Sequence, residues 1–134
     1  MTALLVFTNL PDHAAAEALA KTLVEQRLAA CVNILAACTS VYRWQGTLEM
    51  ASEVPLLIKT TQDRYAALEA AVRAAHPYQL PELIALPIEQ GLPDYLAWIT
   101  AETRAPGFDF NSDLNSNSNS KPPPTPTKSG KLPP

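Results

Sequence analysis

The sequence has few of the residues, and none of the short motifs, from which most active sites are built. Its 134 residues include two histidines and two cysteines. It contains no G-x-S-x-G, no phosphate-binding G-x-x-x-x-G-K-S/T, no G-x-G-x-x-G and no paired C-x-x-C. Because such motifs hold the nucleophiles, phosphates and metals of common enzyme classes, we expect a protein that is not an enzyme. A closed zinc site within one chain is not expected either.

Charge is also scarce, and long hydrophobic runs are absent. Only 17% of the residues are charged and the net charge is −3, which argues against nucleic acid or an anionic membrane as a partner. The hydrophobic content of 47% suffices for a core, but no run is long enough to cross a bilayer. The opening MTALLVFTNLPD lacks the basic region and cleavage site of a signal peptide. These features predict a cytoplasmic protein.

The two cysteines do not suggest a disulfide. Cys31 and Cys38 fall on one predicted strand, where they would lie about 23 Å apart at roughly 3.3 Å per residue. A disulfide requires Cα atoms within about 7 Å. We expect both to be small packing side chains in a reducing compartment.

Composition divides the chain near residue 105. Seven of the 13 prolines follow Ala105, in a segment that is also rich in Asn and Ser. Such a segment cannot bury enough apolar surface to offset its conformational entropy. We predict one folded domain at 1–104 and a disordered tail at 105–134. The alternative for the tail is a ligand for a proline-reading domain, through local polyproline II around 122–126.

The dominant feature of the folded part is the segment 31–60, which alternates with a period of two on both sides of Gln45-Gly46. After the turn, one parity holds Leu48, Met50, Val54, Leu56 and Ile58. Before the turn, the residues predicted to share a face are Val32, Ile34, Ala36, Cys38, Tyr42 and Trp44. This pattern predicts two long strands joined by a tight turn, with Pro55 at a bulge or an edge.

Shorter elements flank this hairpin. We predict a strand at 3–8, a helix at 13–27, a helix at 62–75, a strand at 83–88 and a last helix that starts at 91–94. The first helix has Asp12 as its N-cap. Its predicted apolar stripe is Ala16, Leu19, Ala20, Leu23 and Val24. The last helix offers an apolar cap of Tyr95, Leu96, Trp98 and Ile99.

This order predicts an α+β fold: a ferredoxin-like split β-α-β sandwich with a long β-hairpin and an extra C-terminal helix. With strand order 4-1-3-2, the strands that follow helices lie at the edges. The hairpin would extend beyond the helices with apolar residues on its surface. Since uncovered strands pair with other chains, we expect a closed cyclic oligomer.

Two groups of residues are candidate sites. His76 and Glu82 flank a stiff Pro-Tyr loop, and they could start a copper or zinc site if a neighbouring subunit adds ligands. The alternative for His76 is a role at the C-terminus of the preceding helix. The second group would line a polar pocket between subunits: Lys59, Arg43, Tyr42, Trp44 and Glu53. Its alternative is that the aromatic residues pack an interface and the charges form ion pairs.

Five segments resemble the divalent cation tolerance protein family, CutA, in order and spacing: LAACVNIL, SVYRWQGTLE, LLIKT, HPYQLPELIALPI and DYLAWI. The resemblance spans residues 4–102. It implies a ferredoxin-like homotrimer whose long strands pair between subunits, without an obligatory cofactor. It also implies a role in tolerance to divalent metal ions such as copper.

The copper ligands that the resemblance implies are only partly present. In bacterial relatives they are a cysteine on the first strand and two adjacent histidines before Pro-Tyr. This sequence has Phe7 at the first position and Ala75-His76 at the pair, so that only His76 matches. We therefore expect weak binding of Cu(II) or a similar cation.

Two other functions share this architecture. Nitrogen-regulatory trimers bind small ligands between subunits, and by analogy Lys59 and Arg43 would hold an anion or nucleotide. An acylphosphatase-like enzyme would need an arginine in the loop after the first strand. Residues 8–12 contain none, and we set that function aside.

Overall fold

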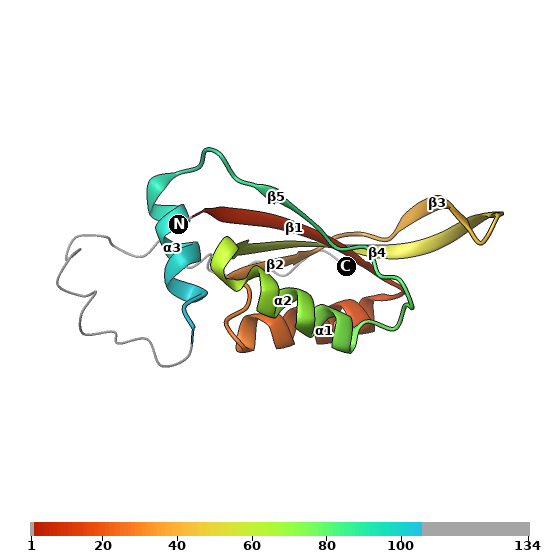
Figure 1. Cartoon of the computed structure of the whole chain (residues 1–134), viewed down its shortest axis with the longest axis horizontal. Helices are drawn as coiled ribbons and strands as arrows, with labels where there is room; N and C mark the ends of the chain where they lie inside the picture. Colours follow the sequence, from red (N-terminus) through yellow and green to blue (C-terminus); the bar gives the residue numbers. More distant parts are fainter. Residues whose placement is uncertain (1, 106–134) are drawn as a thin grey trace.

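The computed structural model describes residues 2–105, which form one antiparallel sheet and three helices (Figure 1). The elements in chain order are β1 (Ala3–Leu10), α1 (His13–Glu25), β2 (Cys31–Ile34), β3 (Cys38–Trp44), β4 (Thr47–Thr61), α2 (Gln62–Ala75), β5 (Ile84–Pro87) and α3 (Pro93–Glu102). None of the described helices is long and apolar enough to span a membrane. The disorder predicted for 105–134 lies, apart from Ala105, outside the described residues.

The strand order is β2-β4-β1-β5, and β3 continues the sheet along the first half of β4. Counted as four strands, with β2 and β3 as one arm, this is the predicted order 4-1-3-2. The strands that follow α1 and α2 lie at the edges, as expected. The α+β class is confirmed.

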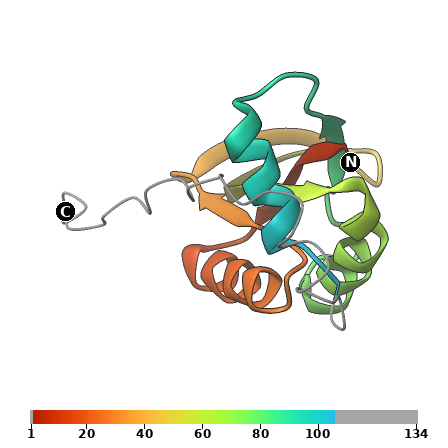
Figure 2. The ribbon, with the colours of Figure 1, turned by 90° about the vertical axis from the view of Figure 1, so that its left-hand side faces the viewer.

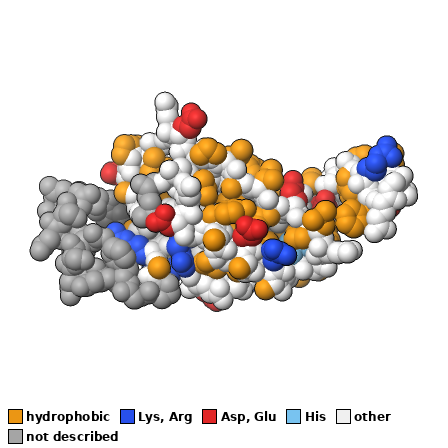
Figure 3. Space-filling model, in the orientation of Figure 1, with side chains coloured by type: hydrophobic (Ala, Val, Ile, Leu, Met, Phe, Trp, Pro, Cys, Tyr) orange, Lys and Arg blue, Asp and Glu red, His pale blue; other side chains and the backbone are white. Residues whose placement is uncertain are grey.

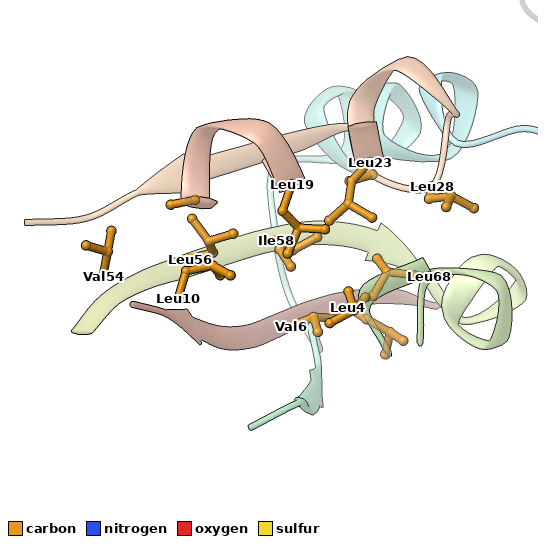
Figure 4. Packing of buried hydrophobic residues seen from close by; sticks show 13 residues of the cluster. Leu4, Val6, Leu10, Leu19, Leu23, Leu28, Val54, Leu56, Ile58 and Leu68 are labelled. Atoms are coloured by element: carbon orange, nitrogen blue, oxygen red, sulfur yellow. The ribbon is translucent and has the colours of Figure 1, made fainter. Parts of the chain in front are cut away.

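The main core lies between the sheet and the two helices α1 and α2, which cover the same face (Figures 2 and 4). Even-numbered residues of β1 and β4 point into it because side chains alternate along a strand. Fully or nearly fully buried members are Val6, Leu10, Leu19, Leu23, Val54, Leu56, Ile58, Leu68 and Val72. This burial fixes the two helices on the sheet.

Helix α1 begins as predicted and ends earlier. The Asp12 carboxylate accepts a hydrogen bond from the backbone N–H of Ala15 at 2.8 Å, which confirms the N-cap. The helix stops at Glu25, and Arg27 adopts a left-handed φ of 57°. Val24 was wrongly assigned to the core: it is 43% exposed and borders a shallow groove beside the short edge strand β2.

Helix α3 forms a second, smaller core at the end of the sheet where β1 begins (Figure 1). Its buried Ile99 packs with Ala3 and Ala30. The predicted apolar cap is confirmed, since Tyr95, Leu96 and Trp98 surround this cluster. Ala3 is an odd-numbered residue of β1, and α3 therefore covers the sheet face opposite to α1 and α2.

The predicted first arm of the hairpin is divided into β2 and β3 by a bulge. Ile34 pairs with Leu56 and Cys38 pairs with Glu53. Between these two pairs the first arm advances by four residues, whereas β4 advances by three. One extra residue between β2 and β3 accommodates this shift. Pro55 lies opposite, and its carbonyl accepts a hydrogen bond from the N–H of Leu35 at 3.0 Å. The bulge predicted at Pro55 therefore occurs in the strand that faces it.

The prediction that the apolar residues of the first hairpin arm share one face is wrong, because of this bulge. Directly paired residues of antiparallel strands project from the same face. Val32 and Ile34 pair with even-numbered residues of β4, on the helix side. Cys38, Tyr42 and Trp44 pair with odd-numbered residues and project from the opposite face. The first arm thus has no single apolar face, because the extra residue inverts the alternation.

The outer half of the hairpin has no cover within the described chain. Leu48 and Met50 have the parity of the core residues, yet each is 68% exposed. Figure 3 shows hydrophobic side chains continuing from the body of the molecule onto the hairpin. The turn itself is tight: Gln45 and Gly46 have φ values of 50° and 81°, which is typical of a type I′ turn.

Candidate functional site

A groove of about 1070 Å³ lies between the hairpin and the connection from α2 to β5. One wall comes from residues 40–44 of β3 with Ala51 and Glu53 of β4, and the other from residues 77–84. Asn9, near the end of β1, lines it as well. The groove is therefore built by three segments that lie far apart in the sequence.

Most of the predicted site residues line this groove. They are Tyr42, Arg43, Trp44, Glu53 and Glu82. Lys59 and His76 are not among the lining residues. The structure thus unites residues that the sequence analysis had assigned to two separate sites, and it leaves out one member of each.

Glu53 and Tyr78 link the two walls of the groove. Glu53 is only 8% exposed. Burial, together with the Glu53 carboxylate that accepts a hydrogen bond from the phenol, raises the pKa of Tyr78 to about 12. Tyr78 therefore stays protonated and keeps its O–H as a donor to the carboxylate at neutral pH. Prolines on both sides of it, Pro77 and Pro81, restrict the backbone of this wall.

His76 is held by backbone groups on both of its ring nitrogens. Nδ1 accepts a hydrogen bond from the N–H of Tyr78 at 3.1 Å, so that nitrogen carries no proton. Nε2 then carries the proton and donates to the carbonyl of Asn9 at 2.6 Å. The side chain is 8% exposed and its ring lies 4.8 Å from that of Tyr78. A metal could reach Nδ1 only if the Tyr78 N–H moved away.

Glu82 is held by the same asparagine. Its carboxylate accepts a hydrogen bond from Nδ2 of Asn9 at 2.5 Å. Asn9 therefore connects His76 and Glu82, the two predicted metal ligands, through its backbone and its side chain. Within residues 2–105, no three His, Cys, Asp or Glu side chains gather closely enough to hold a metal ion.

Lys59 lies towards the other end of the sheet. Its ammonium group donates to Oδ1 of Asn33 at 2.8 Å. It also lies 5.9 Å from the centre of the Tyr95 ring, which belongs to α3. Within one chain, Lys59 and Arg43 do not converge on a shared anion.

The cysteines are not paired with each other. Cys31 is half-buried and pairs across the sheet with Lys59, whereas Cys38 is exposed and pairs with Glu53. The predicted absence of a disulfide between them is confirmed. A packing role for Cys38 stays a prediction, because the side chain has little cover within one chain.

Sequence reasoning missed Asn9 and Tyr78, which organise this region. Tyr78 was visible within the His-Pro-Tyr motif, and its aromatic ring beside two prolines could have suggested a groove wall. Asn9 had no such signal. Asn9 lies 67 positions before His76 in the sequence, and only the fold brings the two residues together.

The fold and sequence match known proteins. The family model of the CutA1 divalent ion tolerance protein matches residues 4–102. The chain is 47% identical over 98 residues to the divalent-cation tolerance protein CutA of Thermus thermophilus, which covers 73% of this chain and 95% of that protein. It is 46% identical over 99 residues to the mouse Protein CutA, covering 74% of this chain and 56% of the mouse protein.

A solved structure agrees with these relationships. The divalent cation tolerance protein of Thermus thermophilus superposes with a TM-score of 0.75 and 45% sequence identity. The superposition covers 76% of this chain and 99% of that structure. Apart from Ala3 at the start of β1, all the described helices and strands lie within the residues that the family model matches.

Proposed function

Because this chain belongs to the CutA1 divalent ion tolerance protein family, we propose that it acts as a non-enzymatic homotrimer in the response to divalent metal ions. The observation that supports this most strongly is the 47% identity to a divalent-cation tolerance protein over 95% of that protein's length. A cytoplasmic location and the absence of an obligatory cofactor stay predictions.

Exposed apolar surface on the hairpin supports the trimer. Val41, Leu48 and Met50 are each at least 60% exposed, and they project from one face of the hairpin. On the other face of the sheet, beyond α3, Ile84 and Leu86 are about half exposed. Covering such surfaces in a closed ring removes them from water and satisfies strand edges without open polymerisation.

For the metal we propose weak binding of Cu(II) or a similar cation near Glu82, with His76 as a second ligand. Glu82 is exposed and supplies an anionic oxygen. His76 joins only when its Nδ1 exchanges the Tyr78 N–H for the metal, which lowers affinity. Phe7 and Ala75 add no donor atoms, so a neighbouring subunit would have to complete the site.

Titration of Cu(II) against four proteins tests this site. We expect weaker binding by Glu82→Gln and by His76→Ala than by the wild type. His13→Ala is the matched control, since His13 is exposed at the start of α1. Equal affinity in all four proteins would eliminate the site. Analytical ultracentrifugation of the same samples tests the trimer independently.

The groove favours a second candidate, a small-ligand signalling trimer. Its volume of about 1070 Å³ is at the upper end of the size typical of small-molecule sites, and Arg43 provides a cation for an anion or nucleotide. A thermal-shift screen tests it, because a ligand at 100 times its dissociation constant adds about 2.7 kcal/mol of stability. We expect the shift to disappear in Arg43→Gln. No shift with any anion would exclude this function.

A further inference from the structure

We propose that Asn9 is the positioning residue of the cation site, the residue that orients both proposed ligands, Glu82 and His76. This inference rests on the proposed function, because it concerns the same two ligands. It requires no accessible surface around Asn9. Both of its contacts lie within one subunit, and they can persist when a trimer covers the groove.

The register of β1 and β5 places Asn9 opposite Glu82. The residue pairs between these two strands end at Phe7 and Ile84. Two residues further along each chain, the same register sets Asn9 against Glu82. Directly opposed residues of antiparallel strands project from the same face, with Cβ atoms about 5 Å apart. The hydrogen bond from Nδ2 of Asn9 to Oε2 of Glu82 at 2.5 Å follows from this placement.

The same register leaves the backbone carbonyl of Asn9 to His76. The carbonyl of Ala3 accepts a hydrogen bond from the N–H of Ile88 at 2.9 Å, and hydrogen-bonded pairs recur at every second residue of antiparallel strands. The Asn9 carbonyl therefore points towards the β5 side, where it accepts the Nε2–H of His76 at 2.6 Å. On the β4 side Asn9 pairs with Pro55, which has no backbone N–H to donate.

Hydrogen bonds of these two kinds orient the ligands of metal ions. A metal-binding histidine typically donates its other ring N–H to a carbonyl or carboxylate, and ligating carboxylates accept hydrogen bonds in turn. Asn9 supplies both. Its carbonyl keeps the proton on Nε2 of His76, so that only Nδ1 can bind a metal. Its amide bonds Oε2 of Glu82 and leaves Oε1 for a cation.

Asn9 is a fixed reference point because of its place in the sheet. Its neighbours in the chain, Thr8 and Leu10, are 0% and 1% exposed, and β1 lies between β4 and β5. Sites built on strands are held more precisely than sites built on loops. His76 caps the end of α2 and Glu82 lies in the connection to β5. One residue of a central strand thus sets the relative position of two ligands from less regular segments.

A double-mutant cycle measured by Cu(II) titration of the full chain distinguishes a positioning role from a structural one. We expect Asn9→Ala to weaken Cu(II) binding about tenfold, the lower end of the range for residues that orient metal ligands. Added to Glu82→Gln, the same change should cause no further loss, because the side chain of Asn9 acts through that carboxylate. A full additional loss in the double variant would overturn the proposal.

Two further variants complete the titration. Asn33→Ala is the matched control, since Asn33 is also a strand asparagine but its side chain accepts a hydrogen bond from Lys59, away from the proposed site. It should bind Cu(II) as the wild type does. Asn9→Gln keeps an amide donor and should bind Cu(II) more tightly than Asn9→Ala. Equal binding by these two Asn9 variants would overturn the role of the amide.

Nitrogen NMR of the labelled imidazole tests the carbonyl contact without copper. In the metal-free chain we expect the proton of the His76 ring on Nε2. Zn(II), used as a diamagnetic probe, should shift the resonance of Nδ1 while Nε2 keeps its proton. A metal-free ring protonated on Nδ1, or binding of Zn(II) through Nε2, would overturn the proposal, because neither is compatible with the bond to the Asn9 carbonyl.

The same titrations separate failure of this inference from failure of the proposed metal site. Weaker binding by Glu82→Gln and His76→Ala but not by Asn9→Ala would overturn the role of Asn9 and leave the site in place. Binding by Glu82→Gln and His76→Ala as tight as that of the wild type would overturn the site, and the role of Asn9 with it.

Discussion

The two halves of β4 have the same alternation of apolar residues, but these residues are buried in one half and exposed in the other. Leu56 and Ile58, in the half covered by α1 and α2, are 0% exposed. Leu48 and Met50, in the hairpin half, are each 68% exposed. A period of two therefore identifies a face that must be covered, but not what covers it. In one half the cover is two helices of the same chain, and in the other we propose a neighbouring subunit.

Truncating one core residue and one hairpin residue should show the difference between the two halves of β4 most clearly. Leu56→Ala should cost about 2–5 kcal/mol, because it removes buried methyl groups and leaves a cavity. Met50→Ala should have little effect at high protein concentration and a growing effect on dilution, as trimer contacts are lost. Denaturant unfolding at several concentrations measures both. Equal, concentration-independent losses would contradict the comparison.

Trp44→Ala should weaken the trimer before it affects copper binding. Truncating a buried aromatic anchor at an interface costs about 2 kcal/mol or more. Of the proposed metal ligands, Glu82 lies on the other wall of the groove and His76 does not line it. Analytical ultracentrifugation with a parallel Cu(II) titration measures the two effects. A fully intact trimer would refute the role of Trp44 in assembly.

In β1, which pairs with the covered half of β4, a buried hydroxyl offers a test that should increase stability. Among the described residues, Thr8 Oγ1 is buried without a hydrogen-bond partner. Thr8→Val should raise stability by about 1 kcal/mol, since an unsatisfied buried polar group is replaced by a methyl group. Thr60→Val is the control: its hydroxyl donates to the Leu28 carbonyl at 2.7 Å. That variant should lose stability, and a gain in both would show that hydrogen bonding is irrelevant here.

The smallest effect concerns the link between the hairpin and the 77–84 wall at high pH. The pKa of Tyr78 is raised from 10.0 to about 12, so the folded state retains a proton that the unfolded state releases. Its contribution is fully present below pH 10 and is lost as the pH rises towards about 12. Thermal unfolding across this range should show a steeper decline for the wild type than for Tyr78→Phe. Parallel curves would contradict the contact with Glu53.

The bulge between β2 and β3 shows where sequence reasoning stopped. The segment 35–37 contains no glycine or proline that would mark an irregularity. The visible signal was Pro55 on the opposite strand. The prediction placed the irregularity at Pro55, whereas the extra residue lies in the strand opposite it. The prediction also did not include the consequence, which is the inverted face of Tyr42 and Trp44. That inversion turns both aromatic residues towards the wall at 77–84.

His76 and Glu82 were recognisable as polar residues around a stiff loop, but their state was not. The sequence shows neither that Asn9 contacts both nor that the Tyr78 N–H occupies a ring nitrogen of His76. These contacts form because β1 ends beside the connection from α2 to β5. The difference matters for function, since it changes His76 from an available ligand into one that must first give up a hydrogen bond.

The sequence by itself determined the elements, the strand order and the family, because alternation, capping and turn residues are local patterns. It also identified most of the residues that line the groove. The tertiary structure decided which of them meet. A single extra residue inverts a strand face. The backbone carbonyl of Asn9 in β1 accepts a hydrogen bond from the imidazole of His76, which lies far away in the sequence. Both are consequences of register and of contacts between segments far apart in the chain, and a linear pattern does not encode either one.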